Sequence, residues 1–113
     1  MKRGSNSEDV TRLTEREVRI LLALAIGKKM TGYEIARQVE VDSSGRLEMG
    51  NGTLRPALER LNSFRFIEDN GKSKKGPGVP ARSWGLTSLG RVILGGELQS
   101  YRKLVNLGDE RAA

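Results

Sequence analysis

Two stretches of the sequence gather side chains that could bind anions. The first, "GNGTLRPALERLNSF" at residues 50–64, carries Arg55 and Arg60. The second is "GKSKKGPGVPAR" at residues 71–82, whose cations are Lys72, Lys74, Lys75 and Arg82. Guanidinium groups bind phosphates or guanine edges through paired N–H donors, and ammonium groups bind phosphate as point charges. The chain has 20 Lys and Arg against 14 Asp and Glu, a net charge of +6, which favours a polyanionic partner.

The composition excludes most enzyme chemistry. The chain has no cysteine and no histidine, which rules out disulfides, thiolate nucleophiles, Cys/His zinc sites and Ser-His-Asp triads. Its acidic residues show no spacing typical of paired catalytic carboxylates or of a metal cage. The lysine-rich loop does not fit a phosphate-binding Walker motif, because Phe66 stands where that motif needs glycine. We therefore expect no enzymatic activity, no metal and no cofactor.

The sequence also predicts a cytoplasmic protein without membrane association. The N-terminal "MKRGSNSEDVTR" has no apolar run that could act as a signal peptide, and the longest apolar stretch, residues 20–26, is too short to span a bilayer. A length of 113 residues suits a single domain with one hydrophobic core.

Two capping boxes mark the first two helices. Thr14 stands three residues before Glu17, at the start of a helix over residues 13–27 whose apolar face includes Ile26. Thr31 and Glu34 repeat the pattern before a short helix over residues 31–41. Gly27 is expected to end the first helix in the left-handed conformation, and "KKM" at residues 28–30 to form a link.

The third helix, over residues 50–64, has two different faces. A helical projection places Leu54, Leu58 and Leu61 together on a buried side and Pro56 on the opposite, exposed side. Proline fits such a helix only near its start, where its missing N–H leaves no hydrogen bond unmade. This side of the helix is therefore free for another role.

A β-hairpin and a fourth helix follow. Residues 64–69 and 82–87 read as strands joined by a basic loop, and Thr87 is an expected N-cap. In the fourth helix we expect Leu89, Val92 and Ile93 in the core and an outward stripe. The stripe consists of Leu94, Leu98, Tyr101 and Val105. Gly95 and Gly96 indicate either a break in this helix or a close approach between helices.

The order of elements, three helices, two strands and a helix, predicts a mainly α fold with a small β-hairpin wing, the winged helix-turn-helix. In such modules the third helix enters the major groove of DNA and the wing contacts flanking phosphates. We expect a flexible N-terminal arm at 1–12, the DNA-binding domain at 13–94, a C-terminal dimerisation helix at 95–108 and a flexible tail at 109–113.

Three motifs, "TGYEIA", "GTLRPALERL" and "GLTSLGR", resemble the PadR family of bacterial winged-helix transcriptional regulators across about residues 13–105. The family pattern reads roughly G-Y-E-I, then G-T-L-Y-P-x-L-x-x-L-E, then Y-x-L-T-x-x-G. The matching residues are Gly32, Tyr33, Glu34 and Ile35, then Gly52, Thr53, Leu54, Pro56, Leu58 and Leu61, then Leu86, Thr87 and Gly90. The chain departs from the pattern at Arg55 (for tyrosine), Asn62 (for glutamate), Arg65 (for glycine) and Trp84 (for tyrosine).

The resemblance implies a sequence-specific regulator, a repressor that binds a pseudo-palindromic operator in double-stranded DNA as a homodimer. Many members also bind a small-molecule effector, but this sequence does not identify one. The expected DNA-binding residues are Tyr33, Arg46, Asn51, Thr53, Arg55, Pro56, Arg60, Lys72, Lys74, Lys75 and Arg82, and the expected dimer interface is Leu94, Leu98, Tyr101 and Val105. The alternatives are a winged-helix accessory or partition protein and a protein-interaction module for an acidic partner.

Overall fold

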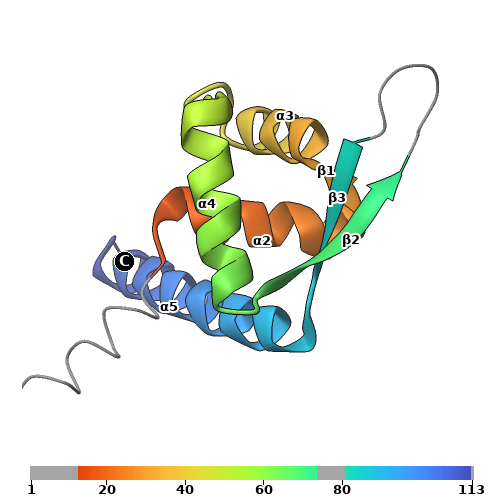
Figure 1. The fold of residues 1–113 in the computed structure, drawn as a ribbon. Coiled ribbons are helices and arrows are strands. Elements are labelled where there is room, and N and C mark those ends of the chain that lie inside the picture. The colour runs from red at the N-terminus through yellow and green to blue at the C-terminus, as the bar shows by residue number, and fades with distance from the viewer. Residues whose placement is uncertain (1–12, 74–80, 113) are drawn as a thin grey trace, which may run out of the picture.

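A computed structural model describes the backbone of residues 13–73 and 81–112 (Figure 1). The helices are α2 (Glu15–Gly27), α3 (Gly32–Asp42), α4 (Asn51–Ser63) and α5 (Ser88–Ala112), and the strands are β1 (Met30–Thr31), β2 (Ile67–Ser73) and β3 (Ala81–Leu86). The expected N-terminal arm at 1–12, and the expected DNA contacts Lys74 and Lys75, lie outside the described residues. Together these elements form the winged helix-turn-helix that the sequence predicts.

The sheet has one strand more than the sequence indicated. Its order is β1-β3-β2, with both pairs antiparallel, and β2 and β3 form the predicted hairpin. In β1, Met30 lies opposite Trp84 and Thr31 lies opposite Ser83. The expectation that residues 28–30 form only a link was wrong, because β1 is created by its pairing with β3 and has no pattern of its own.

Both capping boxes are confirmed. In each, the threonine Oγ1 accepts from the backbone N–H of the glutamate at 3.2 Å, and the glutamate Oε1 accepts from the backbone N–H of the threonine at 2.9 Å. The expected left-handed cap at Gly27 was wrong, because Lys28 takes the positive φ of 65°. A Cβ at Gly27 would lie 2.5 Å from Met30 Sδ, so a larger residue there would displace the flexible end of the Met30 side chain.

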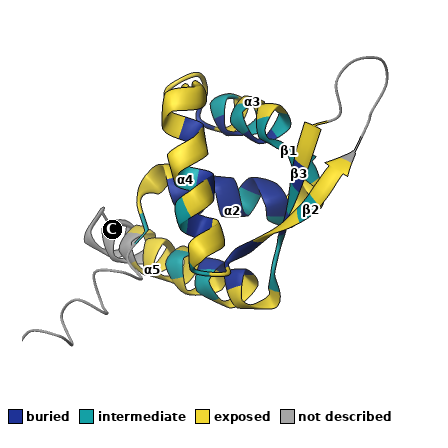
Figure 2. Ribbon diagram, viewed as in Figure 1, coloured by how far each residue is buried: buried dark blue, intermediate teal, exposed yellow. Residues whose placement is uncertain are grey.

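The core surrounds α2. Ile20, Leu21 and Leu24 are fully buried, and Figure 2 shows α2 largely buried behind α4. Ile26, expected on the buried face, is exposed because it lies in the last turn of α2, beyond the core. Trp84 is partly buried and packs against the core from the hairpin.

Helix α5 differs most from the sequence expectation. It runs without interruption from Ser88 to Ala112, so the expected boundary at residue 95 falls inside it, and its end lies beyond residue 108. A Cβ added to Gly95 or Gly96 would meet nothing within 4 Å, so within the described protomer these glycines mark neither a break nor a close approach. The predicted N-cap is confirmed, since Gly90 N–H donates to Thr87 Oγ1 at 2.9 Å.

The buried face of α5 is rotated relative to the expected one. Leu94, expected in the dimer stripe, is only 5% exposed and belongs to the protomer's own core, so that expectation is corrected. Leu89 and Val92, expected in the core, are exposed. The face of α5 that packs on the domain runs through Gly90, Ile93 and Leu94, and the sequence pattern of this helix does not distinguish it from its neighbours.

Candidate nucleic-acid interface

Helix α4 presents the two faces that the sequence predicts. Leu54, Leu58 and Leu61 are buried. The first half of the helix also carries exposed side chains, which are Asn51, Thr53, Arg55 and Pro56. A helix buried along one side and exposed along the other can place its outer side chains in a groove about 12 Å wide.

The N-terminal half of α4 lacks the usual stabilising features. Pro56 is the sixth residue of the helix, so the expectation that it lies in the first turn was wrong, and the helix forgoes one backbone hydrogen bond. Gly50 is the N-cap, no side chain caps the helix, and its first turn has no acidic residue. The positive end of the helix dipole is therefore not neutralised locally.

Most of the arginines expected to bind DNA already have carboxylate partners. The ion pairs are Arg46 with Glu15, Arg60 with Glu17, and Arg82 with Asp69. Among the residues that the structure describes, Arg55 makes no ion pair. Arg55 is thus the arginine on α4 that has no carboxylate partner within the described part of the protomer.

Arg46 lies at the end of α2 that is remote from the hairpin. Its guanidinium contacts both carboxylate oxygens of Glu15, and Arg19 adds a second contact to Glu15 at 3.2 Å. The hydrogen bond from Arg46, followed by that from Arg19, lowers the pKa of Glu15 to about 2. This cluster links the start of α2 to the segment before α4, and both side chains of the Arg46–Glu15 pair remain exposed.

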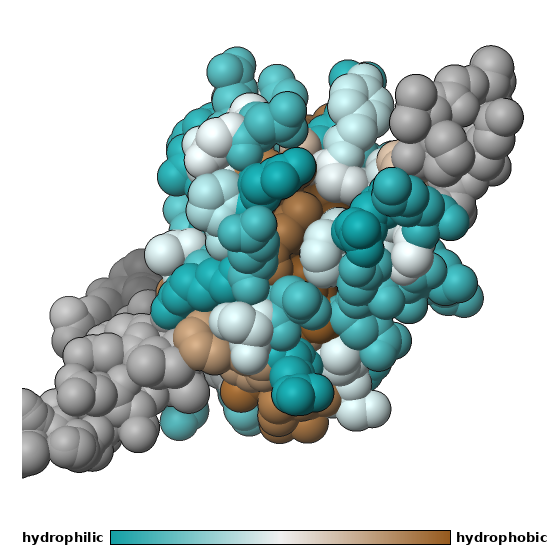
Figure 3. Space-filling model, viewed as in Figure 1, coloured by the Kyte–Doolittle hydropathy of each residue, from teal (hydrophilic) through white to brown (hydrophobic). Residues whose placement is uncertain are grey.

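A groove separates α4 from the hairpin. Leu54, Leu58 and Trp84 provide its apolar part, and Figure 3 shows the apolar floor between polar rims. Polar side chains also line this groove, namely Asn51, Arg55, Glu59, Asp69 and Arg82. The hairpin and the exposed side of α4 therefore flank one concave surface, with Lys72 exposed farther along β2.

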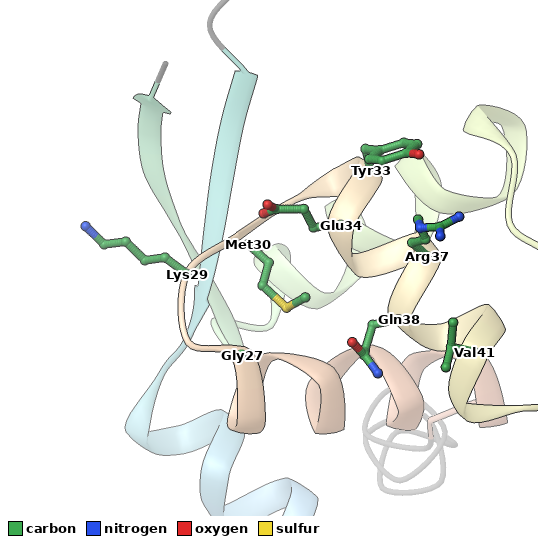
Figure 4. A pocket seen from close by; sticks show the side chains of 8 residues that line it. All are labelled: Gly27, Lys29, Met30, Tyr33, Glu34, Arg37, Gln38 and Val41. Atoms are coloured by element: carbon green, nitrogen blue, oxygen red, sulfur yellow. The ribbon is translucent and has the colours of Figure 1, made fainter. Parts of the chain in front are cut away.

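A second hollow lies between the end of α2 and helix α3 (Figure 4). Tyr33 is 74% exposed, so it is not the half-buried packing residue that an aromatic side chain in a first helical turn usually is. Figure 4 shows Tyr33 and Arg37, one turn apart, on the same side of α3. Lys29 belongs to the same hollow.

Sequence reasoning did not identify Arg37 and Lys29 as exposed cations beside Tyr33. The signal available for Arg37 was its position four residues after Tyr33, which places both on one face of the helix. Lys29 had no such signal, because its place follows from the strand pairing of the residue after it.

Neither a membrane span nor a metal cluster occurs in the described parts of the chain. No described helix is both long and apolar enough to cross a bilayer. Within the same residues, no group of three or more aspartates or glutamates lies close enough together to hold a metal ion.

Comparison with known proteins gives a family and several similar structures. The sequence profile described as "Transcriptional regulator PadR-like family" matches residues 20–95, more than half of the chain. No curated protein sequence matches the chain.

Among solved structures, a PadR family transcription regulator from Clostridium difficile is similar with a TM-score of 0.71 and 23% identity, over 88% of this chain and 100% of that chain. A PadR-like transcription factor from Bacteroides fragilis has a TM-score of 0.66 and 24% identity, over 98% of this chain and 100% of that chain. Bacillus subtilis PadR, solved in complex with operator DNA, has a TM-score of 0.62 and 21% identity, over 73% of this chain but 45% of that chain. At these identities the likeness establishes the fold.

Proposed function

Because the chain belongs to the PadR-like family of transcriptional regulators, we propose that it is a repressor that binds a pseudo-palindromic operator as a homodimer. The observation that carries the proposal is the exposed first half of α4, where Arg55 makes no ion pair with a described residue, beside a groove that the hairpin borders. The similar Bacillus subtilis PadR was solved with operator DNA, which supports the same class of partner for this chain.

The first half of α4 reads base edges in the major groove. Arg55 is long enough for a bidentate contact with guanine, and Asn51 has the amide that pairs with adenine. Thr53 and Pro56 are short and exposed, so they let the helix approach the bases closely. The family pattern has tyrosine at the position of Arg55, so this chain prefers a different base there.

The phosphate contacts come from both sides of α4. On α3, Tyr33 and Arg37 offer a hydroxyl and a guanidinium from one face. Lys72 on β2 supplies an ammonium group, as do Lys74 and Lys75, which follow it in the sequence. Arg82 also contributes, because its pair with Asp69 is exposed, and exposed pairs exchange partners at little cost. We leave Arg60 out of this set because its carboxylate partner, Glu17, is buried. Arg46 is left out because it pairs with Glu15 at the start of α2, the end remote from the hairpin.

The dimer forms through α5. Leu98, Tyr101 and Val105 are exposed at spacings that place them along one side of the helix, and Val105 is 61% exposed. A helix of 25 residues is about 38 Å long, and the part of α5 after Leu94 contributes no buried core residue among those described. Dimerisation covers this apolar stripe and places the two copies of α4 roughly 34 Å apart, or a multiple of that, for successive major grooves.

Two variants test the proposal. Arg55→Ala should weaken operator binding by about 1–3 kcal/mol and relax the preference at one base pair of each half-site. Lys72→Ala, the matched control, should weaken binding to every sequence alike. It should also reduce the slope of log K against log salt concentration by about 0.9, the value for one phosphate contact. Equal losses on all sequences for Arg55→Ala would reduce Arg55 to a phosphate contact. Weak binding of the parent protein to all DNA would favour an accessory or protein-interaction module.

A further inference from the structure

Arg60 makes the most deeply buried ionic contact in the described parts of the chain. Its Nη1 donates to both carboxylate oxygens of Glu17 at 2.5 Å. Glu17 is only 4% exposed, and its Oε1 also accepts from the Thr14 backbone N–H in the capping box of α2. One carboxylate therefore joins the start of α2 to the third turn of α4.

This pair commits the charge of Arg60. If the guanidinium turned outward to a phosphate, the carboxylate of Glu17 would remain buried without its cation, which is strongly unfavourable. Arg60 is cationic and lies on the helix proposed to read DNA. Its side chain is 35% exposed, so it is partly open to solvent. Charge and position alone would assign it to the DNA backbone, but its partner argues against that role.

The contacts of Arg60 continue to the start of α5. The guanidinium carbon lies 5.1 Å from the centre of the Phe64 ring, which lies 5.5 Å from the centre of the Phe66 ring. The carbonyl oxygen of Phe66 accepts from Thr87 N and Thr87 Oγ1 at 3.1 and 3.0 Å. Thr87 is the N-cap of α5, so the pair is part of a junction of α2, α4 and α5.

We propose that Arg60 is a positioning residue for DNA recognition, which fixes the orientation of α4 against α2 through Glu17 and does not itself contact DNA. This inference rests on the proposed function, in which α4 reads the operator. A phosphate contact strengthens binding to any duplex, whereas a positioning contact strengthens binding only where the geometry of α4 decides affinity. The two roles therefore differ in which DNA responds to the mutation.

The test compares five proteins on operator and scrambled duplexes over a range of salt concentrations. They are the parent, Glu17→Gln, Arg60→Gln, the double variant, and Lys72→Gln as the control for a phosphate contact. Glutamine at 17 keeps an oxygen that can accept from Thr14 N–H, so the capping box survives while the charge is removed. Circular dichroism at the binding temperature establishes that each variant is folded, and Arg60→Lys replaces Arg60→Gln if the latter does not fold.

We expect each single variant to lose at least tenfold in affinity for the operator and little for the scrambled duplex. The salt slope should match that of the parent, and the double variant should be no weaker than the weaker single one, because both mutations remove one interaction. Lys72→Gln should instead weaken both duplexes and reduce the slope by about 0.9.

Two results would overturn the inference. A reduced salt slope for Arg60→Gln, with Glu17→Gln unchanged, would show that Arg60 contacts a phosphate. Unchanged operator preference in both variants would show that the pair does not position α4. Failure of the proposed function looks different, since the parent itself would then not prefer the operator over the scrambled duplex.

Discussion

Gly90 is the position in α5 where added volume should be most disruptive. A Cβ there would lie 2.0 Å from the carbonyl oxygen of Phe66 and 2.8 Å from Leu86 Cδ1. That carbonyl is held in place by Thr87, whose N–H and Oγ1 both donate to it. Gly90→Ala must therefore move the first turn of α5 or break one of these hydrogen bonds.

The size of the effect follows from opposing contributions to the free energy of unfolding. Overpacking costs about 1–3 kcal/mol and a lost hydrogen bond about 1 kcal/mol, whereas replacing glycine in a helix returns at most about 1 kcal/mol. The expected net destabilisation is about 2 kcal/mol, which lowers the melting temperature by roughly 10 °C.

Thermal unfolding followed by circular dichroism measures this shift, at low protein concentration so that the protomer dominates. Gly96→Ala is the matched control, because a Cβ there meets nothing within 4 Å, and it should stabilise the protein by about 0.8–1 kcal/mol. A Gly90→Ala protein that melts at or above the parent would contradict this expectation. It would mean that the close approach of α5 to Phe66 does not constrain the fold.

Three further outcomes follow from the structure. Acidification from pH 4.5 to pH 2 should progressively remove the contribution of Glu15 to stability, because its folded-state pKa is about 2 against an ordinary 4.5. Glu15→Gln should flatten the plot of melting temperature against pH over this range. A plot that Glu15→Gln leaves unchanged would contradict the stabilising role of the ion pair. Pro56→Ala should stabilise α4 by about 1–3 kcal/mol in urea unfolding, because it restores a backbone hydrogen bond. A less stable variant would contradict this expectation. Leu98→Glu should convert dimers to folded monomers in sedimentation equilibrium. Leu94→Ala should instead lower the stability of the protomer by about 2–5 kcal/mol. A fully dimeric Leu98→Glu protein would show that the apolar stripe of α5 is not the dimer interface.

Local chemistry made the helix starts predictable from the sequence. The boxes at Thr14 and Thr31 involve residues three apart, so the same few atoms determine both the pattern and the structure. At the exit of α4, Arg65 stands where the family pattern has glycine. Its φ of 65° is in the left-handed region that glycine usually occupies. The buried leucines of α4 were predictable for a similar reason, since helical periodicity alone separates its two faces.

Long-range contacts made the rest unpredictable. Strand β1 exists only through β3, more than 50 residues later. The pairs Arg46–Glu15 and Arg60–Glu17 join residues 31 and 43 positions apart, and no local pattern marks an arginine as already paired. In α5 apolar residues occur around much of the helix, so the sequence could not decide that Leu94 packs inward. Only the docked helix defines that face.

The most direct test of the central claim is binding to DNA from upstream of the chain's own gene, beside a scrambled duplex of equal length, over a range of salt concentrations. We expect ~10³-fold or more tighter binding to the native sequence at physiological salt, because in the proposed complex α4 reads bases while the hairpin binds phosphates. Equal and steeply salt-sensitive binding to both duplexes would contradict the central claim at that site, since the cationic surface would then recognise only the phosphate backbone.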